Sequence, residues 1–260
     1  NISVGYIYDY KFENLKKKSL ELRNKIQQNG AKKIISFFDQ GAVSNYKYSP
    51  GYYQTRESYK FILEKLLNYE WLGLIIKPKK PSLLKKTLGP VYDLLTRAIQ
   101  SNRCHVYLNS DEILDKNFDN PPCEAAMASD LAIHNCLVAG TAGIEAALTN
   151  TDTLYFDYYG FNESLFYNCK NKIVFNNWDI LWDHVINVFN NKNLNYFNQW
   201  NTLLNQIDPF SDGKAMERIE NFSKNLLDLC SNNDDKNSII ENAVKKYKYE
   251  WGSDKILSNF

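Results

Sequence analysis

The sequence lacks an excess of charge of either sign, since 31 lysines and arginines stand against 30 aspartates and glutamates and leave a formal net charge of +1. No global charge therefore attracts the chain to nucleic acid or to an anionic membrane. It also lacks any apolar run of about 18 residues, and its first residues lack the basic segment and apolar core of a signal peptide. We therefore predict neither a nucleic-acid partner nor a membrane span nor secretion.

Cysteine is scarce and follows no pattern. The five cysteines are widely spaced, form no Cys-x-x-Cys pair and stand in no cysteine-histidine cluster with the spacing of a zinc site. An odd number without such a pattern is typical of reduced thiols in a cytosolic protein. The sequence also contains no nucleophile elbow and no Walker lysine motif. We therefore predict a cytoplasmic protein that uses no metal and no bound cofactor.

The sequence has what a folded domain needs. Its 260 residues are 44% hydrophobic, 14% aromatic and 23% charged, which is ordinary for a globular protein with a full core. The chain starts at Asn1 rather than at a methionine. We therefore expect a fragment cut from a longer protein.

Short apolar runs alternate with helical patterns along most of the chain. The runs are continuous rather than alternating, which is typical of parallel strands that are covered on both faces. We predict strands at 33–38, 72–76, 104–108, 131–133, 153–156 and 173–175, and helices at 15–28, 54–69, 91–100, 121–128, 144–148, 178–189, 196–204, 212–230 and 238–249.

This pattern predicts an α/β fold with a doubly wound, Rossmann-like parallel sheet and a helical C-terminal tail. We place an N-terminal helical extension at residues 1–32, the nucleotide-binding domain at 33–190 and the tail at 191–260.

Ligands of open parallel sheets bind outside the carboxyl ends of the strands. Four loops of this chain follow predicted strands in that way: residues 39–41, 77–81, 108–111 and 139–143. We expect these loops to meet at one edge of the sheet.

The most informative of these loops is Gly140-Thr141-Ala142-Gly143, which opens a helix of small residues. The first N–H groups of a helix have no partner within it, so they favour a bound phosphate. The alternative is that the glycines only allow a tight turn and close helix packing.

Basic and acidic side chains stand near this turn. Lys77, Lys79 and Lys80 follow a strand and would reach the same edge, although a lysine run is also typical of a solvated loop. Glu145 is predicted on the first turn of the helix, where it could accept hydrogen bonds from a ribose or simply favour the helix start. His134 ends a strand and could point into the cleft, but a lone histidine there is more often packed, so we leave it out of the predicted site.

Three motifs resemble the C-terminal, nucleotide-binding half of GT-B glycosyltransferases of bacterial surface polysaccharides. That group includes CMP-Kdo transferases of capsule and lipopolysaccharide, polysialyltransferases and CDP-glycerol glycerophosphotransferases. The motifs are residues 75–78 (IIKP), similar to a Lys-Pro or His-Pro strand end, residues 139–146 (AGTAGIEA), similar to an S-T-x-x-x-E-A turn, and residues 208–215 (DPFSDGKA), which look like the stretch before the closing helices.

The resemblance implies roles for individual residues. Phosphate would be bound by Lys77 and Thr141, the ribose by Glu145, and the base near Tyr107 and Asn109. Lys79 and the backbone of Gly140, Ala142 and Gly143 would complete the nucleotide site.

The resemblance has two departures. Lys77 replaces the usual histidine and serves phosphate but not proton transfer. GT-B enzymes generally keep the catalytic base on an N-terminal domain, which this fragment lacks. Asp39 would face the interdomain cleft and could orient the acceptor.

The leading interpretation is the donor domain of an inverting, metal-independent glycosyltransferase that uses a CMP-activated sugar such as CMP-Kdo. Its partners would be the nucleotide-sugar donor, a saccharide or lipid-linked saccharide acceptor, and the missing domain, through which it could lie at the inner face of the cell membrane. The alternatives are a CDP-glycerol or UDP-sugar transferase, a sugar-nucleotide epimerase of the same fold, and a non-catalytic nucleotide-binding partner subunit. In the last case the tyrosine-rich stretch 46–59 would be an interface rather than a lid on the acceptor side.

Overall fold

The computed structural model describes residues 1–42, 49–108, 121–138, 140–169, 172–190, 197–230 and 235–256. The chain forms two compact units. One unit is Leu15–Asn201, and the other combines Asn1–Asn14 with Thr202–Phe260. The sequence placed divisions at residues 32 and 190, whereas in the structure the first 14 residues group with the C-terminal helices.

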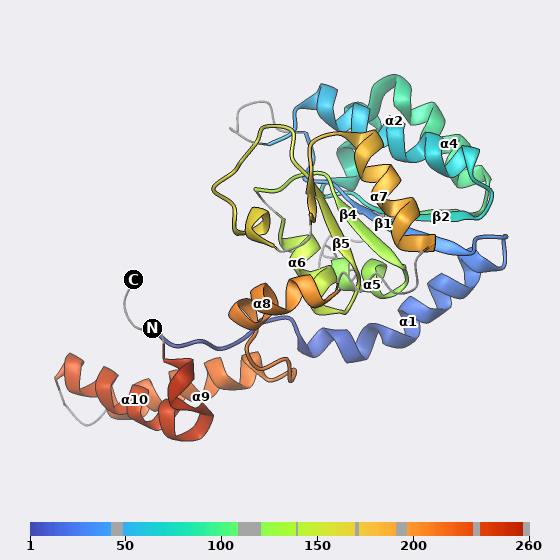
Figure 1. Cartoon of the computed structure of the whole chain (residues 1–260). Coiled ribbons are helices and arrows are strands. Elements are labelled where there is room, and N and C mark those ends of the chain that lie inside the picture. The colour runs from blue at the N-terminus through green and yellow to red at the C-terminus, as the bar shows by residue number, and fades with distance from the viewer. Residues whose placement is uncertain are drawn as a thin grey trace. The chain divides into compact units, whose positions relative to one another are not determined.

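The larger unit is built on one sheet of six parallel strands (Figure 1). The strand order is β3-β2-β1-β4-β5-β6, the order of a Rossmann fold. The predicted α/β, Rossmann-like fold is thereby confirmed. The strands are β1 (Lys33–Phe38), β2 (Leu72–Lys77), β3 (Cys104–Val106), β4 (Leu131–His134), β5 (Thr153–Phe156) and β6 (Val174–Phe175).

Helices cover both faces of this sheet, as the continuous apolar strands predict (Figure 1). One face carries α2 (Tyr52–Asn68), α4 (Tyr92–Gln100) and α7 (Trp178–Asn190), and the other carries α1 (Tyr10–Gln27), α5 (Pro122–Met127) and α6 (Thr141–Leu148). The short helix α3 (Leu84–Leu88) precedes α4.

Side chains that alternate along the strands fill the two cores. Phe37 of β1 meets the ring of Tyr59 on α2, with 5.2 Å between ring centroids. Its neighbours Ile34 and Phe38 pack instead into a cluster with Ile26 of α1 and Ala125 of α5. Each strand therefore sends alternate residues to opposite helical layers.

The smaller unit contains α9 (Ala215–Cys230) and α10 (Lys236–Trp251), and α8 (Phe197–Ile207) spans the division between the units. Its core includes Arg218, which is fully buried. The guanidinium carbon lies 3.4 Å from the ring centroid of Phe210 and 4.4 Å from that of Trp251. Arg218 also pairs with Asp212 and donates to the carbonyl of Val4, so the third motif has a structural role in this unit.

No helix in the described part of the chain combines the length and the apolar character that crossing a bilayer requires.

Candidate functional site

The candidate site lies where the strand order of the sheet reverses. The chain runs from β1 outward to β2 and β3, then returns so that β4 pairs on the other side of β1. Ligands of open parallel sheets bind at such a reversal, because the loops there diverge and leave a crevice. In this chain the crevice lies outside the ends of β1, β2 and β4 and against the first residues of α5 and α6.

Four side chains form a row across the ends of the strands. Phe38 pairs in register with Lys77 on one side and with His134 on the other, and His134 pairs with Tyr155. Since neighbouring strands lie ~4.8 Å apart, the backbones of Lys77 and His134 stand about 10 Å apart. Ala132, two residues before His134, belongs to the core that packs against α5, so the row faces α5 and α6.

A cavity of about 220 Å³ opens against this row. Its wall combines the strand ends with the first residues of α5 and α6, and it includes two lysines and a histidine. The lining residues are Phe38, Asp39, Gln40, Lys77, Pro78, Lys79, Pro122, His134, Thr141 and Ala142. Five of the ten predicted site residues are therefore brought together: Asp39, Lys77, Lys79, Thr141 and Ala142.

Lys77 presents a cation to the cavity. Its ammonium lies 5.7 Å from the ring centroid of Tyr107. Burial lowers the pKa of Lys77, while the nearby carboxylates of Glu145, Glu124 and Asp39 oppose that shift. Within the described residues its ammonium makes no hydrogen bond or close ion pair. A ligand anion would give it a direct partner.

Asp39 is held by the protein itself. Its carboxylate accepts hydrogen bonds from the amides of Gly41 (3.0 Å) and Lys79 (2.8 Å) and from the hydroxyl of Tyr59 (2.5 Å). Burial raises the pKa of Asp39, and these hydrogen bonds oppose the rise. The carboxylate thereby ties the loops after β1 and β2 to α2. The acceptor-orienting role of Asp39 stays a prediction.

Glu145 lies further along α6 than the sequence indicated. The helix begins at Thr141, so Glu145 is on its second turn, and it is 5% exposed. Its carboxylate accepts a hydrogen bond of 2.8 Å from the amide of Cys123 in the first turn of α5. Glu145 therefore links the starts of α5 and α6, and the ribose contact implied by the resemblance stays a prediction.

The two glycines of the turn make room for Tyr155. A Cβ at Gly140 would lie 2.4 Å from the ring of Tyr155, and a Cβ at Gly143 would lie 2.5 Å from its hydroxyl. The hydroxyl donates to the carbonyl of Gly140 at 2.7 Å. Close packing thus accounts for both glycines, as the structural alternative predicted. The same turn leaves the amides of Thr141 and Ala142 without hydrogen-bond partners among the described residues.

The predicted base-binding residues are only partly described. Tyr107 is buried and donates its hydroxyl to Glu124 at 2.9 Å, and its ring meets His105 edge to face. Glu124 in turn lies 2.9 Å from the ammonium of Lys18. Tyr107 therefore supports the wall behind Lys77. Asn109 lies outside the described residues.

His134 is the site residue that the sequence analysis left out. It is 1% exposed, and its Nδ1 accepts a hydrogen bond of 3.1 Å from the amide of Cys136. Burial lowers the pKa of His134 to about 4, so the ring is neutral near pH 7. The available signal was its place as the last residue of the strand that returns to β1.

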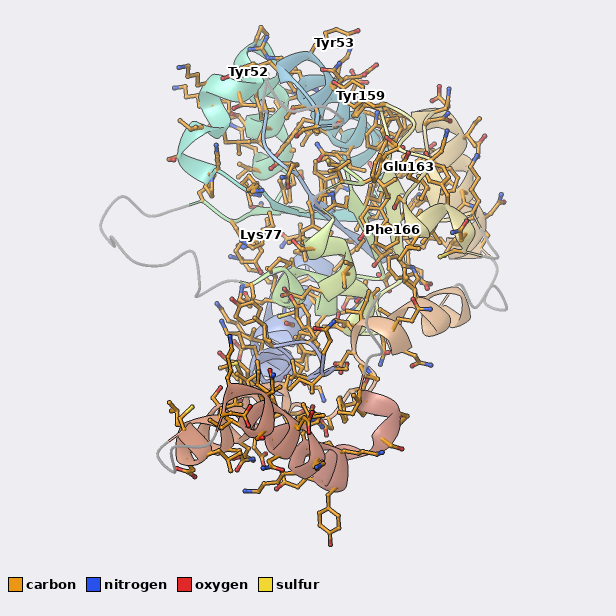
Figure 2. The ribbon with its side chains drawn as sticks, turned by 90° about the vertical axis from the view of Figure 1, so that its left-hand side faces the viewer. Tyr52, Tyr53, Lys77, Tyr159, Glu163 and Phe166 are labelled. Atoms are coloured by element: carbon orange, nitrogen blue, oxygen red, sulfur yellow. The ribbon has the colours of Figure 1, made fainter. Side chains whose placement is uncertain are left out.

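Exposed tyrosines gather beyond the end of the sheet. Tyr52 and Tyr53 open α2, and Tyr159 follows β5; they are 44%, 75% and 43% exposed. The neighbouring Tyr158 donates its hydroxyl to the carbonyl of Gln54 at 2.8 Å, so the loop after β5 rests on the first turn of α2. Figure 2 shows the three tyrosines together in the upper part of the view, with Lys77 lower down.

The fold and the cavity define a Rossmann-like α/β protein with a basic crevice at the switch point of its sheet. Within the described residues, no group of three or more His, Cys, Asp or Glu side chains is placed to hold a metal ion.

Comparisons with known proteins return remote structural likenesses. No protein-family profile matches the chain, and no curated protein sequence matches it. S. aureus MnaA in a co-structure with UDP is similar with a TM-score of 0.45 and 16% identity over 79% of this chain. The N-terminal domain of Candida albicans trehalose-6-phosphate phosphatase is similar with a TM-score of 0.45 and 13% identity over 75%.

A glycosyltransferase from Rickettsia africae ESF-5 is similar with a TM-score of 0.48 and 13% identity over 96% of this chain. The chain spans about half the length of these three solved chains, which are covered to 49%, 45% and 55%.

Proposed function

We propose that this chain is the donor-nucleotide domain of an inverting, metal-independent glycosyltransferase in bacterial surface polysaccharide synthesis. The observation that carries the proposal is the cavity at the switch point, which places Lys77, Lys79 and the start of α6 around one space. These are the groups that favour a phosphate. The cavity by itself supports only phosphate binding. The assignment to the glycosyltransferases rests on the resemblance of the three sequence motifs.

The size of the cavity fits the phosphate part of a donor. Pockets that enclose a drug-sized ligand measure roughly 300 to 1,000 Å³, whereas this one measures about 220 Å³. We therefore assign the cavity to the phosphate of the donor, and the nucleoside and sugar extend beyond it. The acceptor, a saccharide or lipid-linked saccharide, would be bound by the N-terminal domain that a GT-B arrangement implies.

In this function the residues of the chain stabilise the leaving group. As the sugar bond to phosphate breaks, negative charge grows on the phosphate oxygens, and donors fixed in advance stabilise that charge. Lys77 would contribute its ammonium and α6 the amides of Thr141 and Ala142. GT-B enzymes generally keep the catalytic base on an N-terminal domain, and we propose the same arrangement here, so we expect residues 1–260 to bind the donor without turning it over.

The leading donor is a CMP-activated sugar such as CMP-Kdo. A specific observation favours a second candidate, a CDP-glycerol or UDP-sugar donor, because the two lysines of the cavity match the two negative charges of an esterified diphosphate. A sugar-nucleotide epimerase and a non-catalytic nucleotide-binding subunit would use the same phosphate site, and they are separated from a transferase by activity of the full-length protein.

Calorimetric titration with CMP, CDP and UDP tests the proposal. We expect one nucleotide to bind selectively, and Lys77→Met to weaken it by roughly 10- to 100-fold, since a hydrogen bond to a charged group contributes about 1.5 to 3 kcal/mol. Methionine keeps an unbranched apolar side chain at this position and removes the charge. Thr141→Val tests the hydroxyl at the start of α6.

The matched control is Lys80→Met, because Lys80 is exposed on the same loop and does not line the cavity. Affinity that falls equally in Lys77→Met and Lys80→Met would assign binding to general charge attraction. If no nucleotide binds to the folded wild-type chain, the proposal is wrong for this chain.

A further inference from the structure

His134 is a buried polar side chain of which only one ring nitrogen, Nδ1, has a hydrogen-bond partner among the described residues. The ring is 1% exposed and lines the cavity, and it lies between the rings of Phe38 and Tyr155, at centroid distances of 6.4 Å and 5.7 Å. A neutral imidazole has one N–H donor and one acceptor nitrogen. The partner of each nitrogen decides which one carries the proton.

The backbone fixes the tautomer of this ring. Nδ1 accepts the amide N–H of Cys136, so Nδ1 carries no proton and Nε2 carries it instead. Among the described residues no hydrogen bond is found for Nε2. The N–H of Nε2 is therefore a donor that is fixed in place, and the described residues leave it for whatever fills the cavity that His134 lines.

Burial is the main reason that the ring stays neutral. Burial lowers the pKa of His134, the hydrogen bond from the amide of Cys136 opposes that shift, and the charge of Lys79 acts in the same direction as burial. Lys77 lines the same cavity. The carboxylate of Asp39, also in the cavity wall, is occupied by three hydrogen bonds of its own. Tyr155, which packs against the ring, stays protonated, since burial raises its pKa well above the usual value.

We propose that His134 binds the donor phosphate directly, as a neutral hydrogen-bond donor through its Nε2–H, across the cavity from the Lys77 ammonium. The proposal rests on the proposed nucleotide site and adds a contact to it. The two side chains lie on opposite sides of Phe38 in the row, with backbones about 10 Å apart, so side chains reaching inward from both can hold one phosphate between them. A neutral donor makes binding specific for one orientation of the phosphate, because a hydrogen bond is directional. It adds no third positive charge to those of Lys77 and Lys79 in the cavity.

Nitrogen NMR of the histidine rings tests this contact. The chain has three histidines, so selective ¹⁵N labelling gives three ring systems, and His134→Asn identifies the signals of His134. We expect a proton on Nε2 and none on Nδ1 in the free chain at pH 7. Titration with CDP should shift the Nε2 signals of His134 with the same midpoint as calorimetry, while His105 and His184, which do not line the cavity, stay unchanged.

The nucleotide affinity of two variants at position 134 gives a second readout. Glutamine carries an amide N–H about as far from the backbone as Nε2, whereas asparagine carries one only as far as Nδ1. We expect His134→Gln to keep CDP affinity within about threefold and His134→Asn to lose about tenfold or more. If His134→Asn does not fold, His134→Gln identifies the signals of His134, and the titration of the wild-type rings decides.

The outcomes separate this proposal from the one on which it rests. If CDP binds and Lys77→Met weakens it while the His134 signals stay unmoved at saturation, the histidine contact is wrong and the nucleotide site stands. If CMP, CDP and UDP all fail to bind, both are wrong. If only CMP or UDP binds, that nucleotide replaces CDP in the titration and in the affinity measurements.

Discussion

At the scale of single residues, the clearest feature is the contact between Tyr155 and the glycine turn. Gly143 lies inside α6, where helix propensity alone favours alanine over glycine by about 1 kcal/mol. The structure reverses that expectation, because a Cβ at this position would lie 2.5 Å from the hydroxyl of the fully buried Tyr155. Whether alanine at position 143 stabilises or destabilises the protein therefore decides between helix propensity and packing against Tyr155.

We predict that Gly143→Ala destabilises the protein by about 1 to 3 kcal/mol, the usual cost of overpacking a core. Urea unfolding monitored by circular dichroism measures the change. A stabilised variant would contradict the packing, and unchanged nucleotide affinity would show that α6 keeps its position despite the extra methyl group.

A second prediction concerns the protonation of His134. An unfolded histidine has a pKa near 6.5, and burial lowers that of His134 to about 4. As the pH falls from about 6.5 to 4, the unfolded state takes up a proton that the native state refuses, so stability is lost through this range and levels off below it. The loss from this one group is about 3 kcal/mol.

The measurement is the free energy of unfolding as a function of pH in the wild type and in His134→Gln. Their difference isolates the histidine from Asp152, whose pKa is raised to about 6 by burial and which changes stability in the opposite direction. A difference that stays constant between pH 7 and 4 would contradict a buried neutral ring.

At the scale of elements, the loop after β5 is organised by one carboxylate. Asp157 is 2% exposed and accepts hydrogen bonds from the amides of Tyr159 (3.0 Å), Gly160 (3.1 Å) and Phe161 (2.6 Å), and from the hydroxyl of Tyr167 (2.7 Å). A carboxylate with several such donors fixes the path of the chain around it.

We predict that Asp157→Ala destabilises the protein by roughly 2 to 4 kcal/mol and opens this loop to limited proteolysis, because three backbone donors lose their acceptor. Glu163→Ala, an exposed acidic position in the same loop, is the matched control and should change stability by less than about 0.5 kcal/mol. Equal effects of both changes would exclude the organising role of Asp157.

Elements also show how far the sequence predicts the fold. The strands at 33–38 and 153–156 begin and end where predicted, because each is a short apolar run with polar residues on both sides. Helix α6 begins three residues earlier than predicted, at Thr141. Glycine disfavours a helix in an isolated peptide, so the local pattern did not predict a helix that includes Gly143. Gly143 fits here because it packs against Tyr155, a contact that the local sequence does not reveal.

The lining of the cavity was predictable where one segment of the sequence carries the signal. Lys77 was found from its place at a strand end and Thr141 from its place at a helix start, and the cavity contains both. His134 and Tyr155 depend on register between strands that are separated along the chain, and a single sequence does not contain that register. Helix α3 was missed because its five residues are too short to show a period.

At the scale of the whole molecule, the cavity and the buried arginine belong to different compact units. The cavity belongs to residues of the larger unit, whereas Arg218 stabilises the smaller one. Removing one partner of a buried charge network typically costs about 3 to 5 kcal/mol.

We therefore predict that Arg218→Ala lowers the melting temperature of the smaller unit and leaves nucleotide affinity within about twofold of the wild type. Scanning calorimetry with and without the nucleotide measures both effects. Lys224→Ala, on the exposed side of the same helix, is the control. A loss of affinity that parallels the loss of stability would show that the two units fold as one.

The row across the strand ends has a consequence for how this protein can change. Successive residues of a strand point to opposite faces, so removing one residue within β4 would turn its histidine toward α2 and α7 and take it out of the crevice. Loops that follow the row can gain or lose residues without that reversal. Insertions and deletions should therefore accumulate beyond the strand ends during divergence, while the spacing from Leu131 to His134 tolerates only changes that preserve its odd and even positions.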